Sequence, residues 1–140
     1  MRGGRGKGQR GTLDFRSGYN FQEDFTTFCR DSHCRGFWVI HVIATIELAA
    51  GKRAEFLDKF RQLVPKVRAE QGCLEYGPTI DVATEIPAQE GARENVATIV
   101  EKWESIEALE KHLVAPHMIE YRGTVKDLVV QMDLRILEPA

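Results

Sequence analysis

Apolar and polar positions alternate along the first regular stretch of the chain, "WVIHVIATIEL" at residues 38–48. Five apolar side chains would share one face: Ile40, Val42, Ala44, Ile46 and Leu48. Four side chains would share the other: His41, Ile43, Thr45 and Glu47. A period of two residues predicts a β-strand with one buried face.

The spacing of apolar positions changes after the turn "AAGK" at residues 49–52. Within residues 52–69, apolar side chains recur in the period of a helix and form one stripe: Phe56, Leu57, Phe60, Leu63, Val64 and Val67. This pattern predicts an amphipathic helix. Pro65 predicts a kink or an early stop, and Gly72 is expected at the C-terminal cap.

The rest of the chain adds three strands, over residues 73–82, 94–103 and 129–137. Gly77 and Pro78 predict either a bulge in the first of these strands or a position at the sheet edge. On the second, one face would carry Ala97, Ile99, Glu101 and Trp103. The polar residues 83–93 between these two strands are expected to form a loop.

Two short helices are predicted between the last two strands. Ser105 is expected to cap the first, which would turn three apolar side chains inward: Ile106, Leu109 and Leu113. Pro116 would begin the second, and the inward side from there on would hold Met118, Tyr121, Val125, Leu128 and Val129.

The resulting order, β-α-β-β-α-β with the second helix broken in two, predicts an α+β fold of the ferredoxin-like type. Such a fold has an antiparallel sheet with helices on one face. The other face is expected to carry four side chains too apolar to remain in water: Ile43, Thr45, Ile99 and Trp103. A second copy of the chain would cover this face, so we expect a homodimer.

Composition and charge narrow the class of protein. The chain has 140 residues, of which 43% are hydrophobic, and this suits one domain with a real core. Residues 1–36 hold seven Lys/Arg against four Asp/Glu, a charge of +3, so residues 37–140 hold twelve against seventeen, a charge of −5. An acidic domain argues against a nucleic-acid partner or a polyanionic substrate.

The sequence also bears on location and redox state. It has no run of ~20 apolar residues to span a membrane and no apolar secretory signal. Three cysteines, an odd number, do not form a disulfide framework. We therefore expect a cytoplasmic protein.

Two parts of unequal character are expected: a glycine- and arginine-rich, flexible extension over residues 1–36, and one domain over residues 37–140. "CRDSHC" places Cys29, His33 and Cys34 together, but a structural zinc site needs a fourth ligand, so no metal is expected there. A working protein that begins near Val39, after an upstream start choice, is an open alternative.

Candidate chemistry gathers in "IVEKWESIEALEKHLVAPHM", residues 99–118. His112 borders a buried stripe and its ordinary pKa suits a general base, although a histidine at a helix boundary can also bind backbone. His117 follows Pro116 at a helix N-terminus, where the dipole disfavours the imidazolium; an exposed polar residue is the alternative. Glu101 would accept a hydrogen bond from a histidine or form a cross-strand ion pair. Trp103 and Tyr76 would line a slot or pack in the core.

Three stretches together resemble the antibiotic biosynthesis monooxygenase (ABM) domain family over residues 39–140. They are "IHVIATIELAAGKRAEFLDKFRQLVPKVRAEQGCLEYG", "VEKWESIEALEKHLVAPHM" and "LRILEPA". The resemblance implies a dimeric α+β barrel with a pocket between the sheet and the helices of each subunit. Members include monooxygenases that oxidise quinols and polycyclic phenols with O2 and without a cofactor. Relatives degrade haem, isomerise small metabolites or have no assigned activity, so the fold is implied more firmly than the reaction.

The function expected from this resemblance is a cofactor-independent monooxygenase acting on a quinol or polycyclic phenol. No dinucleotide or P-loop fingerprint is present, so an electron-rich phenolate would supply the electrons and the protein a base. The expected catalytic residues are His112, Glu101 and His117. The expected substrate-binding residues are Trp103, Tyr76 and His41. No cofactor and no metal are expected.

Haem is disfavoured by one departure from the family. Haem-degrading relatives carry a ligating histidine late in the helix after the proline, whereas residues 117–123 read "HMIEYRG", with Tyr121 and Arg122 and no later histidine. Two other functions on the same fold remain open: a non-enzymatic dimer that binds a small ligand, and an isomerase of a small carbonyl metabolite.

Overall fold

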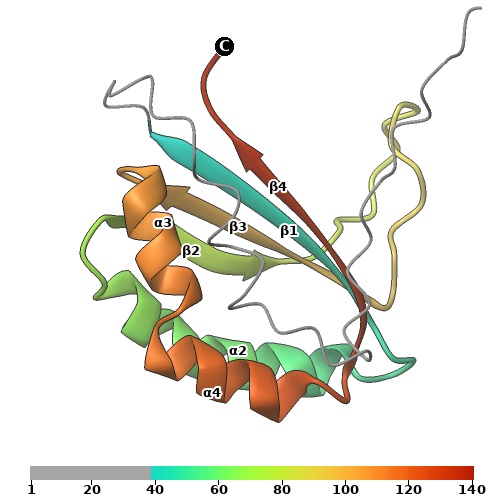
Figure 1. The fold of residues 1–140 in the computed structure, drawn as a ribbon. Coiled ribbons are helices and arrows are strands. Elements are labelled where there is room, and N and C mark those ends of the chain that lie inside the picture. The colour runs from blue at the N-terminus through green and yellow to red at the C-terminus, as the bar shows by residue number, and fades with distance from the viewer. Residues whose placement is uncertain (1–38) are drawn as a thin grey trace, which may run out of the picture.

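The computed structural model describes residues 39–140, which form a four-stranded antiparallel sheet with three helices against one of its faces (Figure 1). The strands are β1 (Ile40–Leu48), β2 (Cys73–Thr79), β3 (Val96–Trp103) and β4 (Val129–Leu137), and their order in the sheet is β2-β3-β1-β4. The helices are α2 (Arg53–Arg68), α3 (Ile106–Leu113) and α4 (Pro116–Val125). This arrangement confirms the ferredoxin-like α+β class. The predicted extension at residues 1–36 lies outside the described residues.

The strands follow the predicted pattern closely. In β1 the five apolar residues of the predicted inner face are buried and the positions between them are not. β4 has the predicted bounds, while β2 ends at Thr79, three residues earlier than predicted. β2 is an edge strand, one of the two outcomes that Gly77 and Pro78 predicted, and its register shift lies between Cys73 and Glu75.

The early stop predicted at Pro65 is wrong, because α2 continues through this residue to Arg68. Val67, in the last turn, is fully buried. Its packing against the core holds that turn although proline removes one backbone hydrogen bond. The predicted cap at Gly72 is also wrong, since Ala69 caps the helix in the right-handed region. Gly72 instead has φ +88° in the turn that leads into β2.

Gly72 is held by close packing as well as by its backbone conformation, and this leads to a first expected result. A Cβ on Gly72 would lie 2.6 Å from the Cβ of Ala108, whereas a Cβ on Gly51, at φ +74°, would meet nothing within 4 Å. Both Gly→Ala changes add backbone strain of about 1–2 kcal/mol, and only Gly72→Ala adds a clash of about 1–3 kcal/mol. Urea unfolding should therefore show a larger loss for Gly72→Ala. Equal losses would contradict the close approach of α3 to this turn.

The sheet face predicted to be bare needs a correction. Ile99 and Trp103 are 2% and 0% exposed. They pair with Ala44 and Ile40 of β1, so they lie on the helix-covered face. The predicted face sharing along β3 is correct, but that face is the one that packs in the core. The opposite face carries Ile43 beside Val100 and Thr45 beside Thr98, all half-buried.

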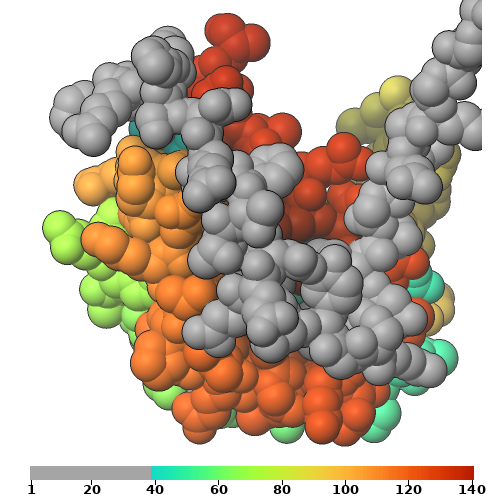
Figure 2. Space-filling view, viewed as in Figure 1, coloured from blue at the N-terminus to red at the C-terminus, as the bar shows by residue number. Residues whose placement is uncertain are grey.

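The helices bury the core against the covered face of the sheet. In a space-filling view from the same side, the residues of α3 and α4 lie next to one another at the surface, coloured orange (Figure 2). Ser105 caps α3 by accepting from the Ala108 backbone N–H at 3.2 Å, and Pro116 occupies the first turn of α4, both as predicted. Within residues 39–140, no helix has the length and apolar character needed to cross a bilayer.

Candidate active site

A cavity of about 90 Å³ lies between the covered face of the sheet and helices α2, α3 and α4. Apolar side chains form most of its wall, and five side chains bring a polar group: Tyr76, Glu101, His112, Tyr121 and Arg122. Since one water needs about 10–15 Å³ of such space, there is room for roughly six to nine waters. A molecule of one or two aromatic rings is therefore of suitable size.

His112 is fixed at one side of this cavity by the rings around it. It lies in the last turn of α3 and is 1% exposed. Its ring centroid is 4.7 Å from that of Trp103 and 5.4 Å from that of Tyr76, which it meets edge to face. Because the packing surrounds the imidazole, its orientation is set before any ligand binds.

A carboxylate that the sequence analysis did not select lies at the Nδ1 atom of His112. Both carboxylate oxygens of Glu70 are 3.1 Å from His112 Nδ1. Oε1 of the same carboxylate is 2.5 Å from His117 Nε2. Glu70 follows the C-cap of α2 and precedes His112 by 42 residues, so no local spacing connects the two. In the sequence it resembles an ordinary polar residue at a helix end.

The Glu70 carboxylate determines what His112 can do. An ionised carboxylate only accepts hydrogen bonds, so the Nδ1–H of a neutral His112 donates to it and the lone pair is left on Nε2. Burial lowers the pKa of His112, opposed by the hydrogen bond and charge of Glu70. His112 lines the cavity and Glu70 does not, so Nε2 is the nitrogen left for a ligand. This is the geometry of a general base held by a carboxylate.

Glu101 has a partner that neither prediction named. Its carboxylate accepts a hydrogen bond of 2.8 Å from the indole Nε1–H of Trp103. The donor is thus Trp103 and not the predicted histidine, whose Nδ1 lies at Glu70, and Glu101 faces the core at 7% exposure and not a cross-strand cation. Burial raises its pKa to about 7, against the Trp103 hydrogen bond and with a contribution from the Glu70 charge. A carboxyl group that titrates near neutrality therefore lines the cavity.

Replacing Glu101 by glutamine should stabilise the fold in a pH-dependent way. The raised pKa means that the folded state binds more protons than the unfolded state between about pH 4.5 and 7. The ionised carboxyl therefore destabilises the fold increasingly as the pH rises through this window, by about 3 kcal/mol in all. Glu101→Gln keeps the acceptor for Trp103 and removes this penalty.

The measurement is the free energy of unfolding of both proteins in urea from pH 4 to pH 8. The variant should gain on the wild type above pH 7 and differ little at pH 4. Glu104→Gln, an exposed residue on the same segment, should show no such dependence. A difference between Glu101→Gln and the wild type that is constant with pH would contradict the buried position of this carboxyl.

Of the three residues predicted to bind substrate, one lines the cavity and two do not. Tyr76 lines the cavity, stacked on Phe60 with centroids 5.3 Å apart, and burial raises the pKa of its hydroxyl. Trp103 does not line the cavity; it lies behind His112 and is fully buried. His41 lies on the opposite face of the sheet, paired with Lys102, because it occupies an odd position in the β1 alternation. It does not line this cavity, so its predicted role in substrate binding has no support from the cavity.

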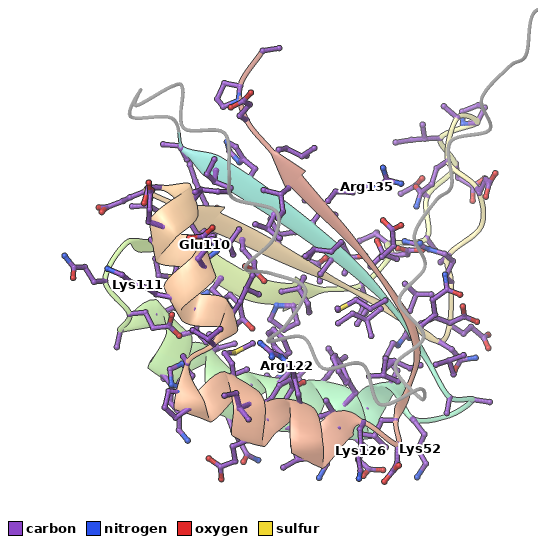
Figure 3. All side chains as sticks on the ribbon, viewed as in Figure 1. Lys52, Glu110, Lys111, Arg122, Lys126 and Arg135 are labelled. Carbon is purple, nitrogen blue, oxygen red and sulfur yellow. The ribbon has the colours of Figure 1, made fainter. Side chains whose placement is uncertain are left out.

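Two cavity residues on α4 were not selected from the sequence as candidate site residues. The Tyr121 ring lines the cavity, and its buried hydroxyl has no hydrogen-bond partner among the described residues. Arg122 is directed from α4 toward the interior (Figure 3) and donates to the Leu113 carbonyl. Burial lowers the pKa of its guanidinium. The cavity thus contains a cation that could bind an anionic ligand oxygen.

Comparison with known proteins identifies the family. Residues 39–124 match the family described as "Antibiotic biosynthesis monooxygenase". A protein of Escherichia coli K12 named "Probable quinol monooxygenase YgiN" is 41% identical over 103 residues, which are 72% of this chain and 98% of that protein. The chain belongs to the antibiotic biosynthesis monooxygenase family. This confirms the resemblance seen in the sequence and makes the protein an oxidoreductase of the monooxygenase class.

Solved structures agree with the ABM assignment. The crystal structure of PA3566 from Pseudomonas aeruginosa superposes with a TM-score of 0.61 at 25% identity, over 74% of this chain and 95% of that one. The crystal structure of a conserved protein from Methanosarcina mazei superposes with a TM-score of 0.62 at 21% identity, over 74% and 95% of the two chains. At this identity the second comparison supports the ABM fold alone.

Proposed function

We propose that this protein is a cofactor-independent monooxygenase that oxidises a one- or two-ring quinol or phenol with O2. The observation that carries the proposal is a buried histidine in an aromatic cavity with a carboxylate at its Nδ1 atom. Family membership supports the reaction class, and the name of the Escherichia coli relative supports a quinol. The mostly apolar lining of the cavity, with a few polar groups, suits an aromatic substrate.

In the first step His112 Nε2 takes the proton of a phenolic hydroxyl. Glu70 stabilises the imidazolium that forms, as the carboxylate of a catalytic triad does. The phenolate is electron-rich, and Arg122 supplies positive charge in the same cavity. His117 is a positioning residue in this scheme, because it contacts Oε1 of Glu70 and does not line the cavity.

The substrate then supplies all the electrons for the reduction of O2. A carbon–oxygen bond forms, the O–O bond breaks, one oxygen atom stays in the product and the other leaves as water. For a naphthohydroquinone the balance is quinol plus O2 to hydroxyquinone plus water. Glu101, with a pKa of about 7, can deliver a proton to the departing oxygen. Two groups whose pKa values are shifted in opposite directions thus serve as acid and base.

Oxygen uptake by protein freed of metals with a chelator tests the proposal. The substrates are 1,4-naphthohydroquinone, 1-naphthol and hydroquinone, with the rate of autoxidation in buffer subtracted. We expect enzyme-dependent uptake with at least one of them. Product formation without oxygen would indicate an isomerase. A raised melting temperature with no turnover would indicate a ligand-binding protein. Either result would overturn the proposal.

We also propose that a second copy of the chain covers the open face of the sheet. Ile43 and Val100 lie side by side there, and Leu137, 48% exposed, pairs with His41 on the same face. Ile43→Asp should convert a dimer into a monomer in light scattering after size exclusion, whereas Ile119→Asp, at an exposed site on α4, should not. A monomeric wild type would contradict this.

A further inference from the structure

We propose that Glu70, His112 and His117 form a binding site for a divalent transition-metal ion that disables the base. One donor atom of each side chain, a carboxylate oxygen, Nδ1 of His112 and Nε2 of His117, lies within 4.8 Å of the others. Two imidazoles and one carboxylate make a donor set that suits Zn²⁺ and Co²⁺. Among the described residues, no other cluster of three His, Cys, Asp or Glu side chains brings its donor atoms this close together.

The three donors come from separate elements that the fold holds together. Glu70 follows α2, His112 lies in the last turn of α3 and His117 lies in the first turn of α4. Their side chains are 16%, 1% and 24% exposed, so packing has already fixed most of their freedom. Little ordering entropy remains to be lost when an ion binds.

The distances between the donors are close to those of a metal site. Ligand atoms about 2.0–2.2 Å from a tetrahedral Zn²⁺ lie roughly 3.3–3.6 Å apart. The separation of 3.1 Å between Glu70 and His112 is slightly below this range, and the contact of 2.5 Å between Glu70 and His117 needs to widen by about 1 Å. His117, the most exposed of the three, has the freedom for this change.

An ion can reach the site without passing through the aromatic cavity. His117 also lines a surface groove of about 190 Å³ between α2 and α4, where water can supply the remaining ligands. Lys59, Lys66 and Glu120 line the same groove. The excess of one positive charge there slows the approach of a cation only weakly at physiological ionic strength.

Metal binding would change the tautomer of His112. When Nδ1 gives its lone pair to a metal, the single hydrogen of the neutral ring must sit on Nε2. The nitrogen that serves as the base would then be a donor, and it could no longer take a proton from a phenol. This consequence for catalysis rests on the proposed function, whereas the metal site and the tautomer change do not.

Calorimetric titration of the chelator-treated full chain with Zn²⁺ tests the site. Cys29 and Cys34 are replaced by serine throughout, so that these thiols cannot bind the ion. We expect one ion per chain, and each of Glu70→Gln and His117→Asn should weaken binding by about 10–100-fold or more. Glu55→Gln, an exposed carboxylate on α2, should leave the affinity unchanged. Absence of saturable binding up to millimolar Zn²⁺, or equal binding by all variants, would overturn the site.

Histidine side-chain ¹H–¹⁵N spectra test the switch independently of any activity. Zn²⁺ should move the His112 hydrogen from Nδ1 to Nε2, and a chelator should restore it. Bound Zn²⁺ with an unchanged tautomer would overturn the switch. Where oxygen uptake is measurable, Zn²⁺ should abolish it reversibly at the occupancy found by calorimetry. A protein without oxygen uptake that still shows the tautomer change would refute the proposed function and leave the site confirmed.

Discussion

Replacing His112 by glutamine should lower kcat/KM for quinol oxidation by about 10²–10⁴-fold, the usual contribution of a general base. The buried imidazole is the group in the cavity that has both a free nitrogen and a carboxylate to stabilise its charged form. Glutamine keeps a polar side chain of similar reach that can still bind Glu70, but it cannot take a proton at neutral pH. Steady-state oxygen uptake with a naphthohydroquinone measures the effect.

His41→Gln is the matched control, because it makes the same chemical change on the opposite face of the sheet. It should leave kcat/KM within about twofold of the wild type. Both variants should unfold cooperatively, which thermal denaturation can check. An active His112→Gln enzyme would mean that another group takes the proton, and Glu101, which lines the same cavity, would be the first to examine.

Replacing Trp103 by alanine should lower the free energy of unfolding by about 3–5 kcal/mol. Trp103 is fully buried, its ring lies against His112, and its indole N–H donates to Glu101. The substitution removes a large apolar volume and also leaves a buried carboxyl without its donor. Denaturation in urea at pH 7 measures the loss.

Trp103→Phe separates these two contributions. Phenylalanine keeps an aromatic ring but no N–H, so the Glu101 pKa should rise further above its ordinary range when the donor is lost. The double variant with Glu101→Leu should recover part of the stability lost in Trp103→Phe. A Trp103→Ala protein as stable as the wild type would contradict the packing around His112.

Most elements of this fold could be predicted from a clear apolar period or from a residue that marks the start of a helix. The β1 alternation assigned both faces of that strand correctly, and Ser105 and Pro116 located the starts of α3 and α4. What the periods did not determine was which face of β3 the helices cover. That depends on the register between strands, which pairs Trp103 with Ile40.

Only the part of the site that lies on α3, β2 and β3 could be predicted from the sequence. His112, Glu101 and Tyr76 line one cavity, and all three were selected from the sequence. Glu70 was missed because its importance comes from a contact across 42 residues that no local pattern encodes. The hydrogen bond between Trp103 and Glu101 was also missed, although residues two apart on one strand face are neighbours, and this signal could have been used.

In the proposed mechanism, one small cavity holds both a base, His112, and an acid, Glu101. Glu70 stabilises the charged form of His112 from outside the cavity, while burial raises the pKa of Glu101, inside the cavity, to about 7. The mostly apolar walls lower the local dielectric and so strengthen both effects. The same Glu70 carboxylate, shared with His117, is what makes the cluster a donor set for a metal ion.

Oxygen-isotope labelling of the product tests the central claim most directly. Chelator-treated protein is incubated with 1,4-naphthohydroquinone under ¹⁸O₂, and the product is analysed by mass spectrometry beside a reaction without protein. The account predicts a hydroxyquinone with one ¹⁸O atom, formed by the wild type and by His41→Gln but not by His112→Gln. An unlabelled quinone formed together with hydrogen peroxide, or a labelled product that forms equally without His112, would contradict it.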